Sequence, residues 1–238
     1  MTLIEHWNGK SWAHVPSPNP SAAGSYLTGI AATSADNAWA VGYSFAPAAS
    51  PRPRVRTLIE RWNGASWSLV PSPSPAGRGD NRLLAVSALS SSNAWAVGYS
   101  REPGARARPL IEHWDGTAWT RVPGAGPGQK HVTLLGVSAV SARSAWAVGT
   151  YSSGGKPFDV GTGNRTLILR WNGTGWHRVG SPNQASKLGS NELTAVAAVS
   201  GTNAWSIGNH AGLGAETEPV AEHWRHGAWH LVATPMLR

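Results

Sequence analysis

The stretch that decides the fold is LIERWNGASW at residues 58–67. The same pattern returns at 3–12, 110–119, 167–176 and 220–229. A second pattern, SADNAWAVG at 34–42, returns at 90–98, 141–149 and 200–208. The leading Trp of the first pattern recurs at spacings of 55, 52, 57 and 53 residues, and the two patterns contain all 14 Trp residues. Internal repetition at such a period indicates an array of similar structural units.

Each pattern predicts a β-hairpin. Strand-forming residues alternate on both sides of a turn-forming pair such as Asn63-Gly64. Gly tolerates the positive φ that tight turns require. In a two-residue turn, Glu60 would lie opposite Trp67. The second pattern turns through Ser-Ala-Asp-Asn at 34–37, where Ser and Asn side chains can cap their own backbone.

One repeat contains four predicted strands, at 27–33, 38–44, 57–62 and 66–70. Four-stranded antiparallel units with a period near 50 are typical of β-propeller blades. A sandwich or an up-and-down barrel does not explain why every Trp returns in phase. We therefore predict an all-β chain forming one β-propeller domain over 1–238, with full blades at 25–73, 81–123, 132–182 and 191–235 and a half blade at 1–18.

The count of about four and a half repeats leaves ring closure open. The chain is a piece of a longer ring, a five-bladed ring with one defective blade, or an open arc that assembles with other chains. An unclosed ring exposes strand edges, which favours self-association.

The repeats resemble those of bacterial β-propeller proteins from Actinobacteria and Chloroflexi, through S-x-x-N-A-W-A-V-G, L-I-E-H-W-N-G-x-S-W and V-P-S-P. They are more distantly similar to Asp-box and photosystem-assembly-factor propeller repeats, although Trp7, Trp62 and their equivalents replace the acidic position of a true Asp-box. The resemblance covers essentially the whole chain. It implies the fold and an extracellular or cell-surface location. Residues 1–20 show no signal peptide, so a cytoplasmic location is the alternative.

Composition excludes several classes of site. The chain has 238 residues and a net charge of +8, with no Cys, so it has no disulfide, thiolate metal site or cysteine nucleophile. No run approaches 18 apolar residues, so no membrane span is expected. The excess positive charge is almost all Arg. No nucleic-acid module accompanies it, so we do not expect a nucleic-acid partner.

The variable connections should share one face. Consecutive antiparallel strands turn at alternate ends, and the short constant turns occupy one end of each blade. The connections of variable length at the other end are where ligands usually bind. Three Arg residues (52, 54 and 56) lie in one of these connections, and Arg101, Arg106 and Arg108 in the next. They predict a surface that binds an anion, which could be an acidic glycan, a phosphate or a nucleic acid, unless they are merely solvated loop residues.

The candidate ligand-binding residues lie on this face. They are the tyrosines where the second strand of each blade ends, and three of the loop arginines: Tyr43, Tyr99, Tyr151, Arg54, Arg106 and Arg108. The recurring Trp residues are interpreted as packing between blades.

Two other groups of polar residues have structural explanations. Glu5, Glu60, Glu112 and Glu222 recur at one repeat position, where a partly buried carboxylate needs a hydrogen bond between blades. Leu169 at the same position argues against catalysis. His223, His226 and His230 lie close together, but the first and second are explained by the repeat and by the turn. We expect no catalytic residue, no metal and no cofactor.

The preferred function is a non-enzymatic binding module, lectin-like or protein-binding, whose partner is a glycan or a protein. The first alternative is a sialidase- or glycosidase-like propeller enzyme, although no unique Tyr–Glu pair and no G-x-S-x-G motif is present. The second alternative is a structural scaffold fragment.

Overall fold

The computed structural model describes residues 1–46, 54–128, 130–152, 163–183, 189–211 and 217–234. Within them, eighteen β-strands form four antiparallel sheets of four strands and one two-stranded hairpin. The hairpin, called the half blade here, consists of β1 (Glu5–Trp7) and β2 (Trp12–His14). The four sheets are called blades 1 to 4 in chain order.

Each blade consists of four consecutive strands. Blade 1 contains β3 (Ser25–Ser34), β4 (Asn37–Phe45), β5 (Val55–Trp62) and β6 (Trp67–Leu69). Blade 2 contains β7 (Asp80–Ser90), β8 (Asn93–Arg101), β9 (Arg108–Trp114) and β10 (Trp119–Arg121). Blade 3 contains β11 (His131–Ser141), β12 (Ser144–Ser152), β13 (Arg165–Trp171) and β14 (Trp176–Val179). Blade 4 contains β15 (Ser190–Ser200), β16 (Asn203–Ala211), β17 (Thr217–Arg225) and β18 (Ala228–Val232).

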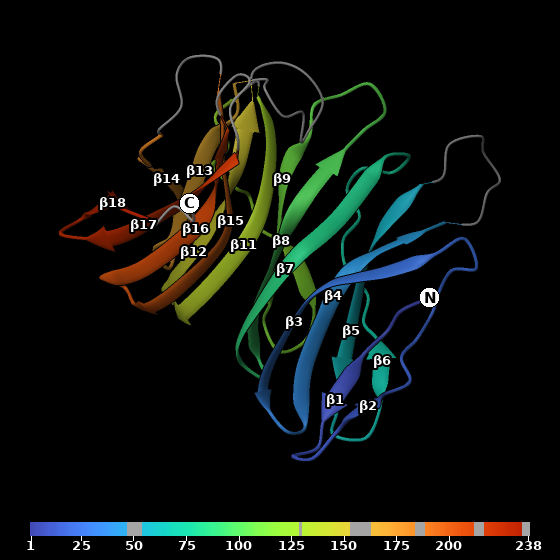
Figure 1. The fold of residues 1–238 in the computed structure, drawn as a ribbon. Helices are drawn as coiled ribbons and strands as arrows, with labels where there is room; N and C mark the ends of the chain where they lie inside the picture. The colour runs from blue at the N-terminus through green and yellow to red at the C-terminus, as the bar shows by residue number, and fades with distance from the viewer. Residues whose placement is uncertain (47–53, 129, 153–162, 184–188, 212–216, 235–238) are drawn as a thin grey trace.

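The blades are arranged side by side about their first strands. β3 contacts β7, β7 contacts β11, and β11 contacts β15. The same three positions of all four strands line a space of about 280 Å³ along this axis, at residues 28–30, 84–86, 135–137 and 194–196. Figure 1 shows the sheets fanning out in chain order, with the half blade at the blade 1 end and blade 4 at the other. The predicted β-propeller fold is confirmed.

A glycine in the second strand of each blade allows the first two strands to pair closely. At Gly98, an added Cβ would lie 1.9 Å from the Arg82 carbonyl oxygen on the neighbouring strand. Gly42, Gly149 and Gly208 have the same restriction. The approach accompanies a register shift in the first strand of each blade, such as that between Leu83 and Ala85. The glycine of Ala-Val-Gly is therefore required by steric contact across the strand pair.

The hairpin between the third and fourth strands differs from its predicted register. Trp62 pairs with Trp67, and Glu60 pairs with Leu69, so four residues rather than two form the loop. The Asn63 Oδ1 atom accepts hydrogen bonds from the backbone N–H groups of Ala65 and Ser66, which a two-residue turn does not offer. Blade 4 has the same register, with Trp224 opposite Trp229, and one more pair, Arg225 with Ala228, leaves a two-residue turn at 226–227.

Tryptophan packing joins neighbouring blades, as predicted. The ring of Trp39 in blade 1 lies 4.9 Å from Trp114 and 5.2 Å from Trp119 in blade 2. The same triad recurs between blades 2 and 3 and between blades 3 and 4, with centroid distances of 4.9 to 5.2 Å. The Arg61 guanidinium lies 5.1 Å from the Trp39 ring and 5.6 Å from the Trp114 ring. Each such cluster buries several aromatic side chains, which dominate the packing energy between blades.

Candidate functional site

The variable connections lie together at one end of the blades, as the sheet order requires. Within each blade the four strands are antiparallel neighbours in chain order. The short turns after the first and third strands therefore share one end. The longer connections share the opposite end, called the variable face here. This face carries the predicted site residues, except that Arg52 lies outside the described residues.

Aromatic residues of blade 1 form the first feature of the variable face. The rings of Tyr26 and Tyr43 stack at 5.2 Å with an interplanar angle of 18°, and Phe45 meets Tyr26 edge-on. The Arg82 guanidinium of blade 2 lies 4.3 Å from the Tyr43 ring. Tyr26 is half exposed, so this cluster offers an aromatic surface beside a cation.

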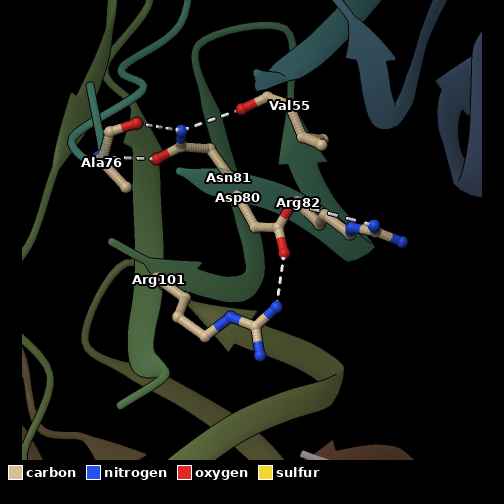
Figure 2. A network of polar contacts seen from close by, with 6 residues as sticks. All are labelled: Val55, Ala76, Asp80, Asn81, Arg82 and Arg101. Atoms are coloured by element: carbon tan, nitrogen blue, oxygen red, sulfur yellow. Dashed lines mark hydrogen bonds and ion pairs between the residues drawn. The ribbon is translucent and has the colours of Figure 1, made fainter. Parts of the chain in front are cut away.

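Beside this cluster, Asp80 holds two arginines (Figure 2). Its carboxylate oxygens lie 2.9 Å from Arg101 Nη2 and 3.9 Å from Arg82 Nη2. The adjacent Asn81 is buried, and its side chain donates to the Val55 carbonyl and accepts from the Ala76 N–H. One carboxylate thus neutralises only part of the positive charge at the junction of blades 1 and 2, while Asn81 connects the two blades.

The three predicted tyrosines occupy different environments. Tyr43 and Tyr99 are equivalent, each opposite the residue that precedes the first-strand Leu. Tyr99 is only 5% exposed, and burial raises its pKa, with Arg82 opposing this effect. Tyr151 lies one position later, because Thr150 occupies the equivalent place in blade 3. A one-residue offset reverses the face of the strand, so the three tyrosines do not form one repeated pocket.

Tyr151 instead has a partner within its own blade. Arg178 donates a 2.8 Å hydrogen bond to the Tyr151 hydroxyl, and the guanidinium lies 4.8 Å from the Tyr151 ring. Arg178 belongs to β14, the last strand of blade 3. This pair is separate from the Tyr43 cluster of blades 1 and 2.

The predicted arginines lie near one another but differ in their surroundings. Arg54 is partly buried in blade 1, and its carbonyl accepts from the Ala46 N–H. Arg106 and Arg108 are exposed on blade 2. Burial lowers the pKa of His131 below its ordinary value, and the charges of Arg106 and Arg101 lower it further. The charges of Arg101 and Arg106 on blade 2 therefore act on His131 at the start of blade 3.

A pocket of about 240 Å³ opens beside Arg108. It is lined by three basic residues, by two prolines and Val132, and by a glycine-rich connection: Arg108, Arg121 and Lys130; Pro109, Pro123 and Val132; Gly124, Gly126 and Gly128. No lining residue is acidic. The N–H groups of Gly126 and Gly128 already donate to carbonyls within the connection. Anion binding would therefore fall to the three cationic side chains.

Sequence reasoning missed Arg121 and Lys130, although a signal for them was present. The connection after the fourth strand reads VPSP at 15–18 and at 70–73, but VPGAGPGQK at 122–130. This segment departs from the repeat, and functional residues are expected where a repeat is broken. The glycine run packs on Pro109 and Ile111, where an added Cβ at Gly124 would lie 3.0 Å from Ile111 Cδ1.

Three of the four recurring glutamates are buried between blades, whereas Glu5 of the half blade is exposed. Glu60, Glu112 and Glu222 are all fully buried. Burial raises the pKa of Glu112 to about 8 and the pKa values of Glu60 and Glu222 to about 7. Ser181 of blade 3 donates to Glu222, as the predicted hydrogen bond between blades requires. The described residues provide no such partner for Glu60 and Glu112, so the prediction is wrong for those two.

Other classes of site find little support in the described part of the chain. It contains no group of three or more His, Asp or Glu residues arranged to hold a metal ion. His223 is instead stacked on Trp205, with ring centroids 4.1 Å apart. None of the described segments is a helix with the length and apolar character that a membrane crossing needs.

Comparisons with known proteins add little about function. No protein-family model matches the chain, and no curated protein matches its sequence. The fold is similar to that of a solved structure described as a GH43_12 retrieved from capybara gut metagenome, at 10% identity and a TM-score of 0.48. The alignment covers 87% of this chain and 41% of that chain, so this chain spans less than half the length of its structural neighbour.

Proposed function

We propose that this protein is a non-enzymatic β-propeller binding module, lectin-like in action, that binds an acidic glycan on the variable face of blade 2. The observation that carries the proposal is the pocket with Arg108, Arg121 and Lys130 and no acidic residue in its lining. A carboxylate or sulfate group on a sugar complements three converging cations, and Arg can bind such a group with two hydrogen bonds.

The size and surroundings of the pocket fit one charged sugar rather than a large ligand. Its volume of about 240 Å³ lies just below the range typical of pockets for drug-sized molecules. The exposed Tyr26 ring and the partly neutralised Arg82 and Arg101 lie on the same face toward blade 1. These groups offer stacking and charge to neighbouring sugars of a longer chain.

The binding interpretation is favoured over a glycosidase. Most glycosidases need two carboxyl groups facing the scissile bond, roughly 5 to 10 Å apart. The pocket lining contains no acidic residue. Burial raises the pKa values of Glu60, Glu112 and Glu222, which are fully buried between blades, and that of Glu192, which is partly buried in β15 of blade 4 and does not line the pocket. By its resemblance to bacterial propeller repeat proteins, we place the module outside the cell or at its surface.

The test is a glycan-binding measurement with three classes of probe: uronic-acid oligomers, sulfated oligosaccharides and neutral oligosaccharides. We expect the wild-type protein to bind an acidic class and to release it as the salt concentration rises. Arg121→Ala and Lys130→Ala should each weaken binding about tenfold, since a hydrogen bond to a charged group contributes about 1.5 to 3 kcal/mol.

Matched controls come from the opposite end of the blades. Arg143→Ala, in a short turn of blade 3, and Arg225→Ala, at the last hairpin, also remove exposed cations and should leave binding unchanged. Equal binding of neutral and acidic glycans would contradict the proposal. So would full binding by an Arg108→Ala/Arg121→Ala double variant, or no binding of any acidic probe.

A further inference from the structure

Blade 4 presents to solvent a face that the other three blades bury. At the second-strand positions of Ala-Trp-Ala-Val, the Trp and Val side chains of blades 1, 2 and 3 are at most 1% exposed. In blade 4 the equivalent Trp205 is 41% exposed and Ile207 is 56% exposed. Residues two apart in a strand lie on the same face, so Trp205 and Ile207 form one apolar surface, called the socket here.

The structure shows what normally covers this surface. Each buried second-strand Trp contacts two indoles from the hairpin of the following blade, as Trp146 contacts Trp224 and Trp229. Trp205 of the socket already contacts a histidine of its own blade, as a buried second-strand Trp does. His223 stacks on Trp205 at 4.1 Å, as His113 lies 4.3 Å from Trp95 inside the arc. Inside the arc this face is covered by that pair of indoles and by the first strand of the following blade, as Leu193 of β15 belongs to the same core cluster as Trp146 and Val148. The socket lacks both, and its Trp205 lacks the incoming pair of indoles.

The half blade carries such a pair. Trp7 and Trp12 are paired in the same register as Trp114 and Trp119. The Trp7 and Trp12 rings lie 5.9 Å apart at 51°, close to the 6.0 Å and 45° of Trp114 and Trp119. Trp7 is 48% and Trp12 is 66% exposed, whereas Trp114 and Trp119 are buried against Trp39. The half blade thus has the matching shape, called the plug here.

The plug and the socket lie at opposite ends of the arc (Figure 1). We propose that they bind each other between two copies of this chain, with Trp7 and Trp12 of one copy packing on Trp205 and Ile207 of the next. The contact would repeat the indole packing that already joins neighbouring blades. Such a contact is heterologous, because the two copies use different surfaces, so it extends into a closed ring or an open filament.

The size of the contact sets its expected strength. A buried aromatic residue contributes about 150 to 250 Å², so three indoles and an Ile supply less than the roughly 1,200 Å² of a stable standard interface. We therefore expect association that depends on concentration, with monomers at about 1 µM and larger species at 100 µM or above.

The experiment blocks one end of the chain at a time and follows assembly by sedimentation velocity. Trp205→Glu removes the socket, and the double variant Trp7→Ser/Trp12→Ser removes the plug. Each variant alone should stay monomeric, because its remaining end has no partner. An equimolar mixture should form a 1:1 dimer that grows no further, since the intact plug of the first variant meets the intact socket of the second.

Control measurements separate the proposal from misfolding and from general stickiness. All substituted side chains are exposed. In the mixture, each variant binds through its unaltered plug or socket, which shows that the variant is folded. Tyr26→Ser removes an equally exposed aromatic ring on the variable face and should leave assembly unchanged. A wild-type protein that is monomeric at every concentration would overturn the proposal. Assembly of either blocked variant alone, or a mixture that stays monomeric, would also overturn it.

Discussion

Trp95 and Trp205 occupy the same position of the same repeat but have different surroundings. Trp95 is 1% exposed and contacts Trp171 and Trp176 of the next blade. Trp205 is 41% exposed, although a histidine of the same blade lies beside the indole in both cases. Each blade therefore supplies the second-strand Trp of an interface, and the following blade supplies the two indoles that bury it. Stability in such an array is approximately a sum of units and nearest-neighbour contacts.

The largest expected effect comes from removing the same side chain in the two places. Trp95→Ala should lower the free energy of unfolding by about 3 to 5 kcal/mol, because it leaves a cavity between two blades. Trp205→Ala should lower it by only about 1 to 2 kcal/mol, since the substitution loses the contact with His223 but leaves no closed cavity. Urea unfolding at about 1 µM protein measures both. Equal losses would show that the burial of these two residues does not differ in solution.

A pH experiment compares a buried glutamate with its exposed equivalent. The pKa of Glu112 is raised from 4.5 to about 8, so between these values the folded state keeps a proton that the unfolded state releases. The contribution of the Glu112 carboxyl group to the free energy of unfolding is fully present below pH 4.5. This contribution is lost as the pH rises through 8. Glu112→Gln should therefore stabilise the protein at pH 8.5, on the order of 2 kcal/mol, and change little at pH 4.5.

The matched control is Glu5→Gln, at the same repeat position in the half blade, where the side chain is exposed. This variant should follow the wild-type stability at both pH values. The measurement is denaturant unfolding at pH 4.5 and 8.5. If Glu112→Gln shows the wild-type dependence on pH, the carboxyl group is not the buried, protonated group described here.

The smallest expected effect concerns the hydrogen bond that distinguishes Glu222 from Glu112. The Ser181 hydroxyl donates to Glu222 and lowers the pKa of its carboxyl group against the effect of burial. Ser181→Ala should raise the pKa of Glu222 above its value of about 7, because burial then acts on the carboxyl group without an opposing donor. NMR titration of the side-chain carboxyl carbon of Glu222 measures the change. A pKa that stays constant or falls would contradict the assigned donor.

The fold was more predictable than the site. Five returns of the Trp-Asn-Gly-type hairpin determine strand order and blade architecture, because repeated patterns must form repeated contacts. The register of that hairpin was predicted wrongly, since the Asn63 side chain stabilises a longer loop. Tyr151 was grouped with Tyr43 and Tyr99, although one inserted position, Thr150, turns it to the other face.

Arg121 and Lys130 were missed because a pocket depends on the path of a connection through space. The residues lie nine positions apart, on either side of a glycine-rich segment that folds back on Pro109. Spacing along the chain does not specify that path. The loss of the VPSP pattern at 122–130 marked the segment as different without saying which side chains it brings together.

The sequence by itself determined the type of blade, its strands and the role of its tryptophans. The alternation of side chains along a strand and the period of the repeat are local features of the sequence, and they are present in every repeat. Only the tertiary structure decided which of those tryptophans are buried by a neighbouring blade and which cationic side chains line the same pocket. The burial of a residue depends on its neighbours as well as on the residue itself, so the equivalent Trp95 and Trp205 are 1% and 41% exposed. That difference produces both the proposed assembly surface and the tests that would exclude it.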